Sequence, residues 1–252
     1  MNAIDIRELR FAYPDGHVAL DGIDLSVAEG ERVAVLGPNG AGKTTLMLAL
    51  NGVLLPTSGS VSIYDSPVGK STLREVRRRV GLVFQDPDDQ LFMPTLAEDV
   101  AFGPANFGVD GPELAQRVAE ALEAVSMTQH ASASPHHLSG GQRRRGALAT
   151  VLACRPDILV LDEPSANLDP VARRELADTL LTLDTTMLVV THDLPYAAQL
   201  CDRAVIVDDG RVVADDSVDA ILADTALLAA HRLELPWGFD AETLRRARVC
   251  QR

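Results

Sequence analysis

The sequence is poor in aromatic residues and cysteine, and it contains no long apolar segment. Aromatic residues make up only 4% of the 252 residues, so the core must be built from Ala, Val, Leu and Ile. The three cysteines, Cys154, Cys201 and Cys250, are far apart and in no metal-ligand or redox spacing, which is typical of packing residues in a reducing cytosol. No stretch approaches the ~18 apolar residues that cross a bilayer, and the N-terminus lacks a signal-peptide pattern. We therefore expect a folded, soluble chain without a membrane span of its own.

The balance of charge argues against a nucleic-acid partner. Asp and Glu total 36 against 23 Lys and Arg, for a net charge of -13, whereas nucleic-acid binders take most of their affinity from basic surfaces. Two short arginine clusters, Arg77 to Arg79 and Arg143 to Arg145, are interpreted as solvated helix faces or ion-pair partners. Lysine occurs only at Lys43 and Lys70, which makes the surroundings of Lys43 informative.

Apolar runs and turn residues predict an α/β fold. Ile4 to Tyr13 and Val18 to Val27 predict paired strands separated by a Pro-Asp-Gly turn. Further along the chain, short apolar runs predict strands in the interior of a sheet: Val33 to Leu36, Val80 to Phe84, Ile158 to Leu161, Thr186 to Val190 and Ala204 to Val207. The segment Arg211 to Ala214 is expected to complete a hairpin. The core therefore carries an antiparallel β subdomain at its N-terminus.

Helical patterns fill the long gap between two of these strands. No convincing strand lies between residues 87 and 156, whereas Pro112 to Val125 and Gln142 to Cys154 have helical patterns, as do Lys43 to Asn51 and Pro170 to Leu183. We therefore expect a helical subdomain, about residues 87–156, inserted into the α/β core. Residues 1–216 are predicted to form the main domain, and residues 217–252 a short helical tail.

A phosphate-binding motif follows the strand Val33 to Leu36. Residues 37–45 match the P-loop pattern of Gly, four residues, then Gly-Lys-Thr. Glycines allow the backbone to curl so that N–H groups point at phosphate oxygens, and the following helix adds the positive end of its dipole. Lys43 is expected to neutralise the β- and γ-phosphates, and the Thr44 hydroxyl to ligate Mg²⁺. The predicted binding residues are Gly37, Pro38, Asn39, Gly40, Ala41, Gly42, Lys43, Thr44 and Thr45.

Four polar residues follow other predicted strands, where open α/β sheets bind ligands. Asp162 is suited to coordinating Mg²⁺ through water, and Glu163 to polarising an attacking water as general base. Gln85 is placed to reach the Mg²⁺ or its water, and His192 to contact the γ-phosphate. A lone Gln or His after a strand is more often structural, but their shared placement favours a role at this centre.

The segment Leu138 to Gln142 reads Leu-Ser-Gly-Gly-Gln, a polar turn that starts a helix. Its N–H groups and Ser139 are suited to cradle a second phosphate cluster. This segment, between a P-loop and an Asp-Glu strand, is the signature of ABC ATPases. The sequence resembles that family over nearly its whole length, up to about Asp216.

The resemblance implies an ATPase that uses ATP and Mg²⁺, with Lys43, Gln85, Glu163 and His192 as catalytic residues. Tyr13 matches the aromatic residue that stacks on adenine, Gln85 the Q-loop glutamine, and Ser165 to Asp169 the D-loop, although Asn167 is unusual there. Mg²⁺ is assigned to Thr44, Gln85 and Asp162. In the family, the signature turn contacts ATP held by another subunit, which assigns Ser139, Gly140, Gly141 and Gln142 to nucleotide binding. The chain therefore needs a partner, most simply a second copy.

Residues 84–92 and 95–104 resemble the ATPases of energy-coupling-factor importers, which import transition-metal ions and vitamins. In that group this region docks on a transmembrane coupling subunit, and a separate membrane subunit selects the substrate. Phe92 to Thr95 and His231 to Pro236 make the cobalt or nickel importers the most similar group, and a biotin or other vitamin importer is the alternative. His136 and His137 are interpreted as structural. The implied location is peripheral, at the cytoplasmic face of the membrane.

Two other classes of function remain to be weighed. A soluble ABC ATPase acting on DNA or the ribosome is disfavoured because the spacing from Gln85 to Leu138 leaves no room for a coiled coil, the chain has one motor domain, and it is acidic. A binding module with an inactive site is disfavoured because Lys43, Glu163 and His192 are all present.

Overall fold

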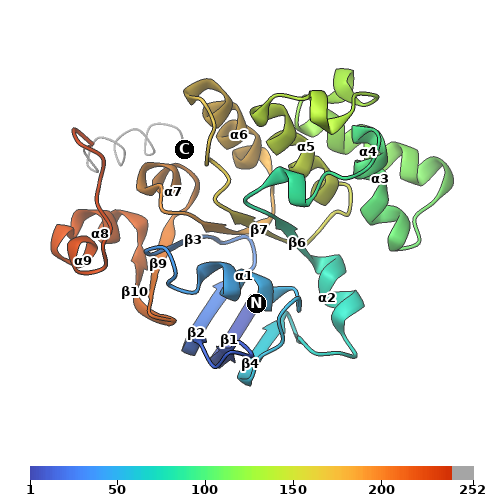
Figure 1. Ribbon diagram of the computed structural model, residues 1–252. Coiled ribbons are helices and arrows are strands. Elements are labelled where there is room, and N and C mark those ends of the chain that lie inside the picture. Colours follow the sequence, from blue (N-terminus) through green and yellow to red (C-terminus); the bar gives the residue numbers. More distant parts are fainter. Residues whose placement is uncertain (240–252) are drawn as a thin grey trace.

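The computed structural model describes residues 1–239 and contains two β-sheets with helices around them (Figure 1). The larger sheet has the strand order β10-β9-β3-β8-β7-β6, in which β10 pairs antiparallel with β9 and the other five strands run parallel. The smaller sheet is antiparallel, in the order β2-β1-β4-β5. The predicted α/β architecture with an antiparallel β subdomain is confirmed. The strand bounds are β1 (Asn2–Ala12), β2 (Val18–Ala28), β3 (Arg32–Leu36), β4 (Ser58–Ile63), β5 (Ser66–Pro67), β6 (Val80–Val83), β7 (Ile158–Asp162), β8 (Thr186–Val190), β9 (Arg203–Asp208) and β10 (Arg211–Ser217).

The central strands are apolar throughout because both faces of the larger sheet are covered. In β3, Val33 and Val35 pack on one side, while Ala34 and Leu36 pack on the other. All four are fully buried, as a parallel sheet between two layers requires. The continuous apolar runs in the sequence therefore mark the strands that lead to the site.

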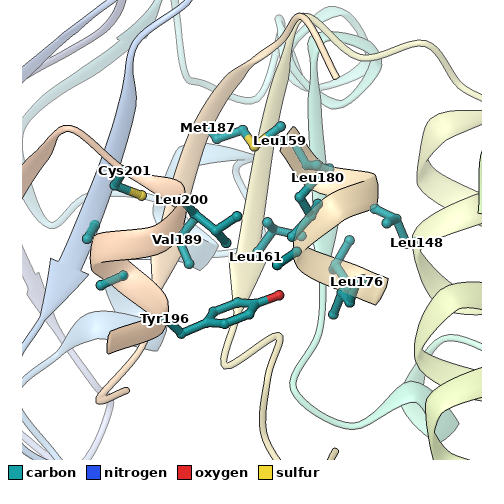
Figure 2. Packing of buried hydrophobic residues seen from close by; sticks show 14 of the residues in the cluster. Leu148, Leu159, Leu161, Leu176, Leu180, Met187, Val189, Tyr196, Leu200 and Cys201 are labelled. Atoms are coloured by element: carbon teal, nitrogen blue, oxygen red, sulfur yellow. The ribbon is translucent and has the colours of Figure 1, made fainter. Parts of the chain in front are cut away.

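Different elements cover the two faces of the larger sheet. On one face, α6 (Pro170–Thr182) and α7 (Leu194–Leu200) pack on β7 and β8, and Figure 2 shows Leu176 and Leu180 beside Leu161. On the other face, α1 (Lys43–Leu50) lies between this sheet and the smaller one (Figure 1). The packing of α1 places the loop before it at the carboxyl ends of the parallel strands.

A helical region connects β6 to β7, as predicted. It contains α3 (Leu96–Asn106), α4 (Gly111–Ala124) and α5 (Gly140–Leu152), with short 3₁₀ turns η1 (Pro87–Asp89), η2 (Thr128–His130) and η3 (Pro135–His137). Three helices in the described part of the chain were not predicted: α3, α7, and α2 (Leu73–Arg79), which precedes β6. Glycine and proline at residues 103 and 104 hide the helical pattern of α3, which nevertheless starts with a capping box between Thr95 and Glu98.

Two short helices, α8 (Val218–Ala223) and α9 (Thr225–Ala230), follow β10. Nδ1 of His231, just after α9, lies 2.8 Å from Oδ2 of Asp208 at the end of β9, which ties this segment to the core. The division into domains at residue 216 stays a prediction, and Cys250 lies outside the described residues. Within residues 1–239, no helix combines the length and the apolar character needed to span a bilayer.

Candidate nucleotide site

At two positions of the loop between β3 and α1, the backbone conformation and the space available allow only glycine. Gly37 and Gly42 have φ values of +148° and +100°. A Cβ atom on Gly37 would lie 2.0 Å from the carbonyl oxygen of Val207, and one on Gly42 would lie 2.4 Å from that of Ala19. Because these neighbours are backbone atoms, neither position has room for a side chain. The loop is thus held against β9 and β2 in a curled shape.

Lys43 begins α1 and folds back over this loop. Its Nζ donates to the carbonyl oxygens of Gly37, at 2.7 Å, and Pro38, at 2.9 Å. The side chain is 7% exposed, and burial lowers the pKa of Lys43, while the nearby Glu163 and Asp162 carboxylates oppose that change. No side chain caps the N-terminus of α1, so the first N–H groups of the helix have no side-chain acceptor.

Asp162 ends β7 directly beside the same helix. The Thr44 hydroxyl donates to Oδ2 of Asp162 at 3.1 Å. Asp162 is 4% exposed, and burial raises the pKa of this carboxyl group, whereas the hydrogen bond from Thr44 lowers it. The structure therefore brings together Thr44 and Asp162, the hydroxyl and the carboxylate to which the sequence assigned Mg²⁺.

Glu163 is held by the segment that follows β8. Its Oε2 accepts from the Thr191 hydroxyl at 3.0 Å, and its Oε1 accepts from the backbone N–H of His192 at 3.1 Å and lies 2.8 Å from His192 Nδ1. Glu163 itself has the uncommon φ of +45°. Its backbone N–H donates to the carbonyl oxygen of Val190, which holds the backbone in this conformation. Sequence reasoning missed Thr191, which is fully buried; its place beside His192 is the only local signal.

Apart from Gly37 and Pro38, the predicted residues of this half-site line one cavity of about 340 Å³. Gln85 and His192 reach it from the ends of two different strands, β6 and β8, and the side chain of His192 remains 64% exposed. Two residues that the sequence did not indicate, His17 and Ala19, also face it. The complete lining is Tyr13, His17, Ala19, Asn39, Gly40, Ala41, Gly42, Lys43, Thr44, Thr45, Gln85, Asp162, Glu163 and His192.

Tyr13 lines the same cavity, and the ring of His17 lies beside its own. Its hydroxyl lies 3.1 Å from Oγ1 of Thr45, and its ring is nearly parallel to that of His17, with centroids 6.3 Å apart and planes 11° apart. Phe11 packs edge-on against Tyr13 from the core side. The arrangement presents two aromatic rings at one end of the cavity, which suits a flat base.

The signature turn is a well-formed helix N-terminus. Ser139 caps α5: its hydroxyl accepts from the N–H of Gln142 at 3.3 Å, and Oε1 of Gln142 accepts from the N–H of Ser139 at 2.8 Å. Because that oxygen is engaged, the amide nitrogen of Gln142 faces Nε2 of His130, 3.1 Å away. His130, which the sequence did not indicate, therefore supports this turn from η2.

Most residues of the signature turn do not face the P-loop of the same chain. Ser139, Gly141 and Gln142 line a separate cavity together with D-loop residues Asn167 to Asp169. Only Gly140 also faces a cavity that Thr44 and Asp162 line. Asn167 has φ +60°, a conformation that asparagine tolerates better than most residues, which explains its presence in the D-loop. One chain thus presents two half-sites rather than one closed site.

Comparison with known proteins agrees with this geometry. Residues 20–166, more than half of the chain, match the ABC transporter family. A putative ABC transporter ATP-binding protein of Streptomyces coelicolor is 62% identical, over 96% of this chain and 94% of the relative. The energy-coupling factor transporter ATP-binding protein EcfA of Methanothermobacter thermautotrophicus is 45% identical, over 98% of this chain and 80% of the relative.

Two solved structures share the fold. The structure of cbiO1 from Clostridium perfringens, part of the ABC transporter complex cbiONQ, has 33% identity and a TM-score of 0.81, covering 100% of this chain and 99% of that one. A dimeric ATP-binding cassette in a post-hydrolysis state, bound to ADP and Pi, has 29% identity and a TM-score of 0.77, covering 85% and 98% of the two chains. The chain belongs to the ABC transporter family and is an ABC ATPase.

Proposed function

We propose that this chain is the motor subunit of an energy-coupling-factor importer, peripheral at the cytoplasmic face of the membrane. The observation that carries this proposal is the 45% identity to an EcfA over 98% of the chain. The likeness to cbiO1, itself part of a transporter complex, supports it over the whole fold. The cavity that Lys43, Glu163 and His192 line together supports the ATPase part of this proposal.

Each residue of the P-loop cavity has a task set by its position. Lys43, now bonded to two carbonyl oxygens, exchanges those acceptors for phosphate oxygens when ATP enters, while the N–H groups of α1 face the phosphates. Glu163 orients and deprotonates the attacking water. His192 holds the Glu163 carboxylate and offers its exposed ring to the γ-phosphate. Tyr13 and His17 cover the adenine.

The donor set fits Mg²⁺. A hydroxyl and a carboxylate at 3.1 Å, with an amide from Gln85 facing the same cavity, are hard oxygen donors of the kind this ion prefers. Thr44, Asp162 and Gln85 would hold it, Asp162 through water. When bound, the ion neutralises charge on the phosphates.

Two copies are needed to close the site. The signature turn of one chain covers the ATP held by the P-loop of the other, so each triphosphate bridges the two chains. Loss of the γ-phosphate contacts then allows the copies to separate. The dimeric relative with ADP and Pi supports this arrangement.

The helical region offers a surface for the transmembrane coupling subunit. Phe92 and Phe102 are 61% and 43% exposed, and their rings pack edge-to-face with centroids 5.0 Å apart. Exposed aromatic pairs of this kind mark binding surfaces. They lie in the region, residues 84–104, that resembles the docking segment of energy-coupling-factor ATPases. A separate membrane subunit selects the cargo, for which cobalt or nickel is our first candidate.

Affinity capture of the chain from detergent-solubilised membranes, followed by transport in vesicles, tests the proposal. We expect a transmembrane coupling subunit and a substrate-specific subunit to co-purify, and the reconstituted complex to take up Co²⁺ or Ni²⁺ in an ATP-dependent way. Uptake of biotin or another vitamin instead would support the assignment as an importer ATPase and replace cobalt or nickel as the substrate. Recovery of DNA or ribosomes without membrane subunits would overturn the importer assignment.

Two variants serve as matched controls in this experiment. Glu163→Gln is expected to capture the same membrane subunits but to transport nothing. The double variant Phe92→Ser, Phe102→Ser is expected to lose the membrane subunits and to keep ATP binding, because both rings are exposed and neither lines the nucleotide cavity. Capture that survives this double substitution would place the docking surface elsewhere.

A further inference from the structure

Arg144 lies inside the molecule, unlike the arginines on either side of it. It is 4% exposed, whereas Arg143 and Arg145 reach Asp88 at 3.5 Å and Glu175 at 3.3 Å in surface ion pairs. The interpretation of the whole cluster as solvated or ion-paired is therefore wrong for Arg144. A helix turns by about 100° per residue, so three consecutive side chains cannot share one face, and Arg144 takes the inner one.

The guanidinium of Arg144 donates to backbone carbonyl groups of two distant loops. Nη1 donates to Phe84 at 3.1 Å and also to Gln85, and Nη2 donates to Ala166 at 3.2 Å. Phe84 and Gln85 begin the loop after β6, which we call the Q-loop (residues 84–90). Ala166 belongs to the D-loop (residues 165–169). One side chain thus connects both loops to the helix that starts with the signature turn.

The energetic cost of this arrangement argues that it has a purpose. Burial lowers the pKa of Arg144, and the charges of Asp86, Asp162 and Glu163 act against that change. Within residues 1–239, no carboxylate lies within 4 Å of the guanidinium, and Nε is buried without a hydrogen-bond partner. A buried cation with incomplete compensation is rarely the most stable choice, since apolar residues often do as well at such positions.

The D-loop reaches both half-sites, and the Q-loop reaches the half-site formed by the P-loop. Both loops also line one cavity together with Thr44 and Gly140. Gln85 faces the cavity of the chain's own P-loop. On the D-loop side, Asn167 shares a cavity with the signature turn, and the Ser165 hydroxyl donates to Asp193, next to His192, at 3.2 Å. Because a planar guanidinium bonds both loops in a fixed fork, neither loop can shift far without moving the other.

We propose that Arg144 is a positioning residue that couples the Q-loop to the D-loop, so that the two half-sites of the chain move as one unit. The proposal rests on the proposed ATPase site for its functional meaning, but the coupling itself is a property of the single chain. Lysine at this position keeps the charge and loses the fork, because one ammonium group on a flexible stem cannot hold both loops in the same geometry.

Hydrogen exchange on the full chain without nucleotide tests the coupling directly. Backbone N–H groups of Gln90, Leu91, Ala166 and Leu168 are hydrogen-bonded to carbonyl groups in these loops or directly beside them, so they report local opening. In Arg144→Lys we expect exchange at least ~10-fold faster in both loops, with β3 and β8 unchanged. Arg155→Gln, which removes an exposed arginine paired with Glu120, should leave both loops as in the parent protein.

ATP turnover supplies the second readout. We expect Arg144→Lys to lower kcat by at least ~10-fold while KM for ATP stays within about twofold, because binding residues of the P-loop are untouched. Arg144→Gln should show the same loss of kcat if the variant folds. If Arg144→Gln does not fold, the result for Arg144→Lys alone tests the proposal. Exchange that accelerates in only one loop, or a lysine variant with normal exchange and kcat, would overturn the proposal. Failure to find membrane subunits would leave this result unaffected and would bear on the importer assignment only.

Discussion

The P-loop and the signature turn are both proposed to bind phosphate, yet their surroundings in this chain are opposite. Lys43, Asp162 and Glu163 are at most 7% exposed and have partners within the chain. Ser139 and Gly140 are exposed, and a Cβ atom added to Gly140 would meet nothing within 4 Å. The chain thus buries one proposed half-site within its own fold and leaves the other exposed.

The difference has a physical origin. The P-loop half-site needs a buried lysine and carboxylates, because desolvated charges act more strongly on a phosphate than charges in water. The signature turn needs only helix N–H groups and a hydroxyl, which can remain solvated until another copy covers them.

Glu163→Gln is expected to have the largest effect. The amide cannot take a proton from water, so kcat should fall by ~10²–10⁴, while ATP binding persists. The stalled protein should elute as an ATP-dependent dimer in size-exclusion chromatography with MgATP. Glu113→Gln, which changes an exposed ion pair with Arg117, is the matched control. Near-normal turnover by Glu163→Gln would show that Glu163 is not the general base. A variant that stayed strictly monomeric with MgATP would contradict a nucleotide site shared between two chains.

Mixing two inactive variants tests the division between the half-sites. Lys43→Ala damages only the P-loop half, and Gly140→Asp damages only the signature half, since the added carboxylate has room to fit but repels phosphate. Each variant alone should be inactive. A one-to-one mixture contains mixed dimers with one intact site each, and its steady-state rate should recover to roughly a quarter of the parent rate. Absence of recovery, with both variants folded, would mean that the half-sites do not meet between chains.

Cys154, just beyond the C-terminal end of α5, is expected to make the stability of the fold depend on pH. Cys154 follows α5 and packs on Gly103, where a Cβ atom would lie 2.5 Å from its sulfur. Burial raises the pKa of this thiol from 9.0 to about 11. The folded state therefore keeps the proton where the unfolded state loses it, so stability is complete below pH 9 and is lost as the pH rises towards 11.

Urea unfolding of the parent protein and Cys154→Ala measures this pH dependence. Going from pH 8 to pH 10, the parent should lose about 1.4 kcal/mol of unfolding free energy relative to the variant. The absolute stabilities of the two proteins at pH 8 do not enter the comparison. An equal loss in both proteins would show that this thiol is not responsible.

Tyr13→Phe is expected to have the smallest effect. It removes only the contact between the Tyr13 hydroxyl and Thr45, worth about 1 kcal/mol, and keeps the ring beside His17. KM for ATP should rise less than ~5-fold with kcat unchanged. Tyr13→Ala removes the ring and should raise KM further. Equal effects of the two substitutions would assign the role to the hydroxyl and not to stacking.

Local patterns predicted that Lys43, Asp162 and Glu163 would lie together, and the three residues line one cavity. A Gly-rich loop between an apolar strand and a helix, and an acidic pair at a strand end, specify their geometry within a few residues. By contrast, α3 was missed because Gly103 and Pro104 interrupt its pattern. Its helical state depends on packing against α5, where Gly103 meets Cys154.

The sequence by itself predicted the succession of strand, glycine loop and helix, the glycine positions, and the placement of Lys43, Asp162 and Glu163, because each follows from neighbouring residues. Only the tertiary structure decided that Thr191 holds Glu163, that His130 supports the signature turn, and that Arg144 joins two loops. Those contacts join segments 12 to 60 residues apart in the chain. No local spacing encodes them, since they exist only after the sheet and the helical region have packed together.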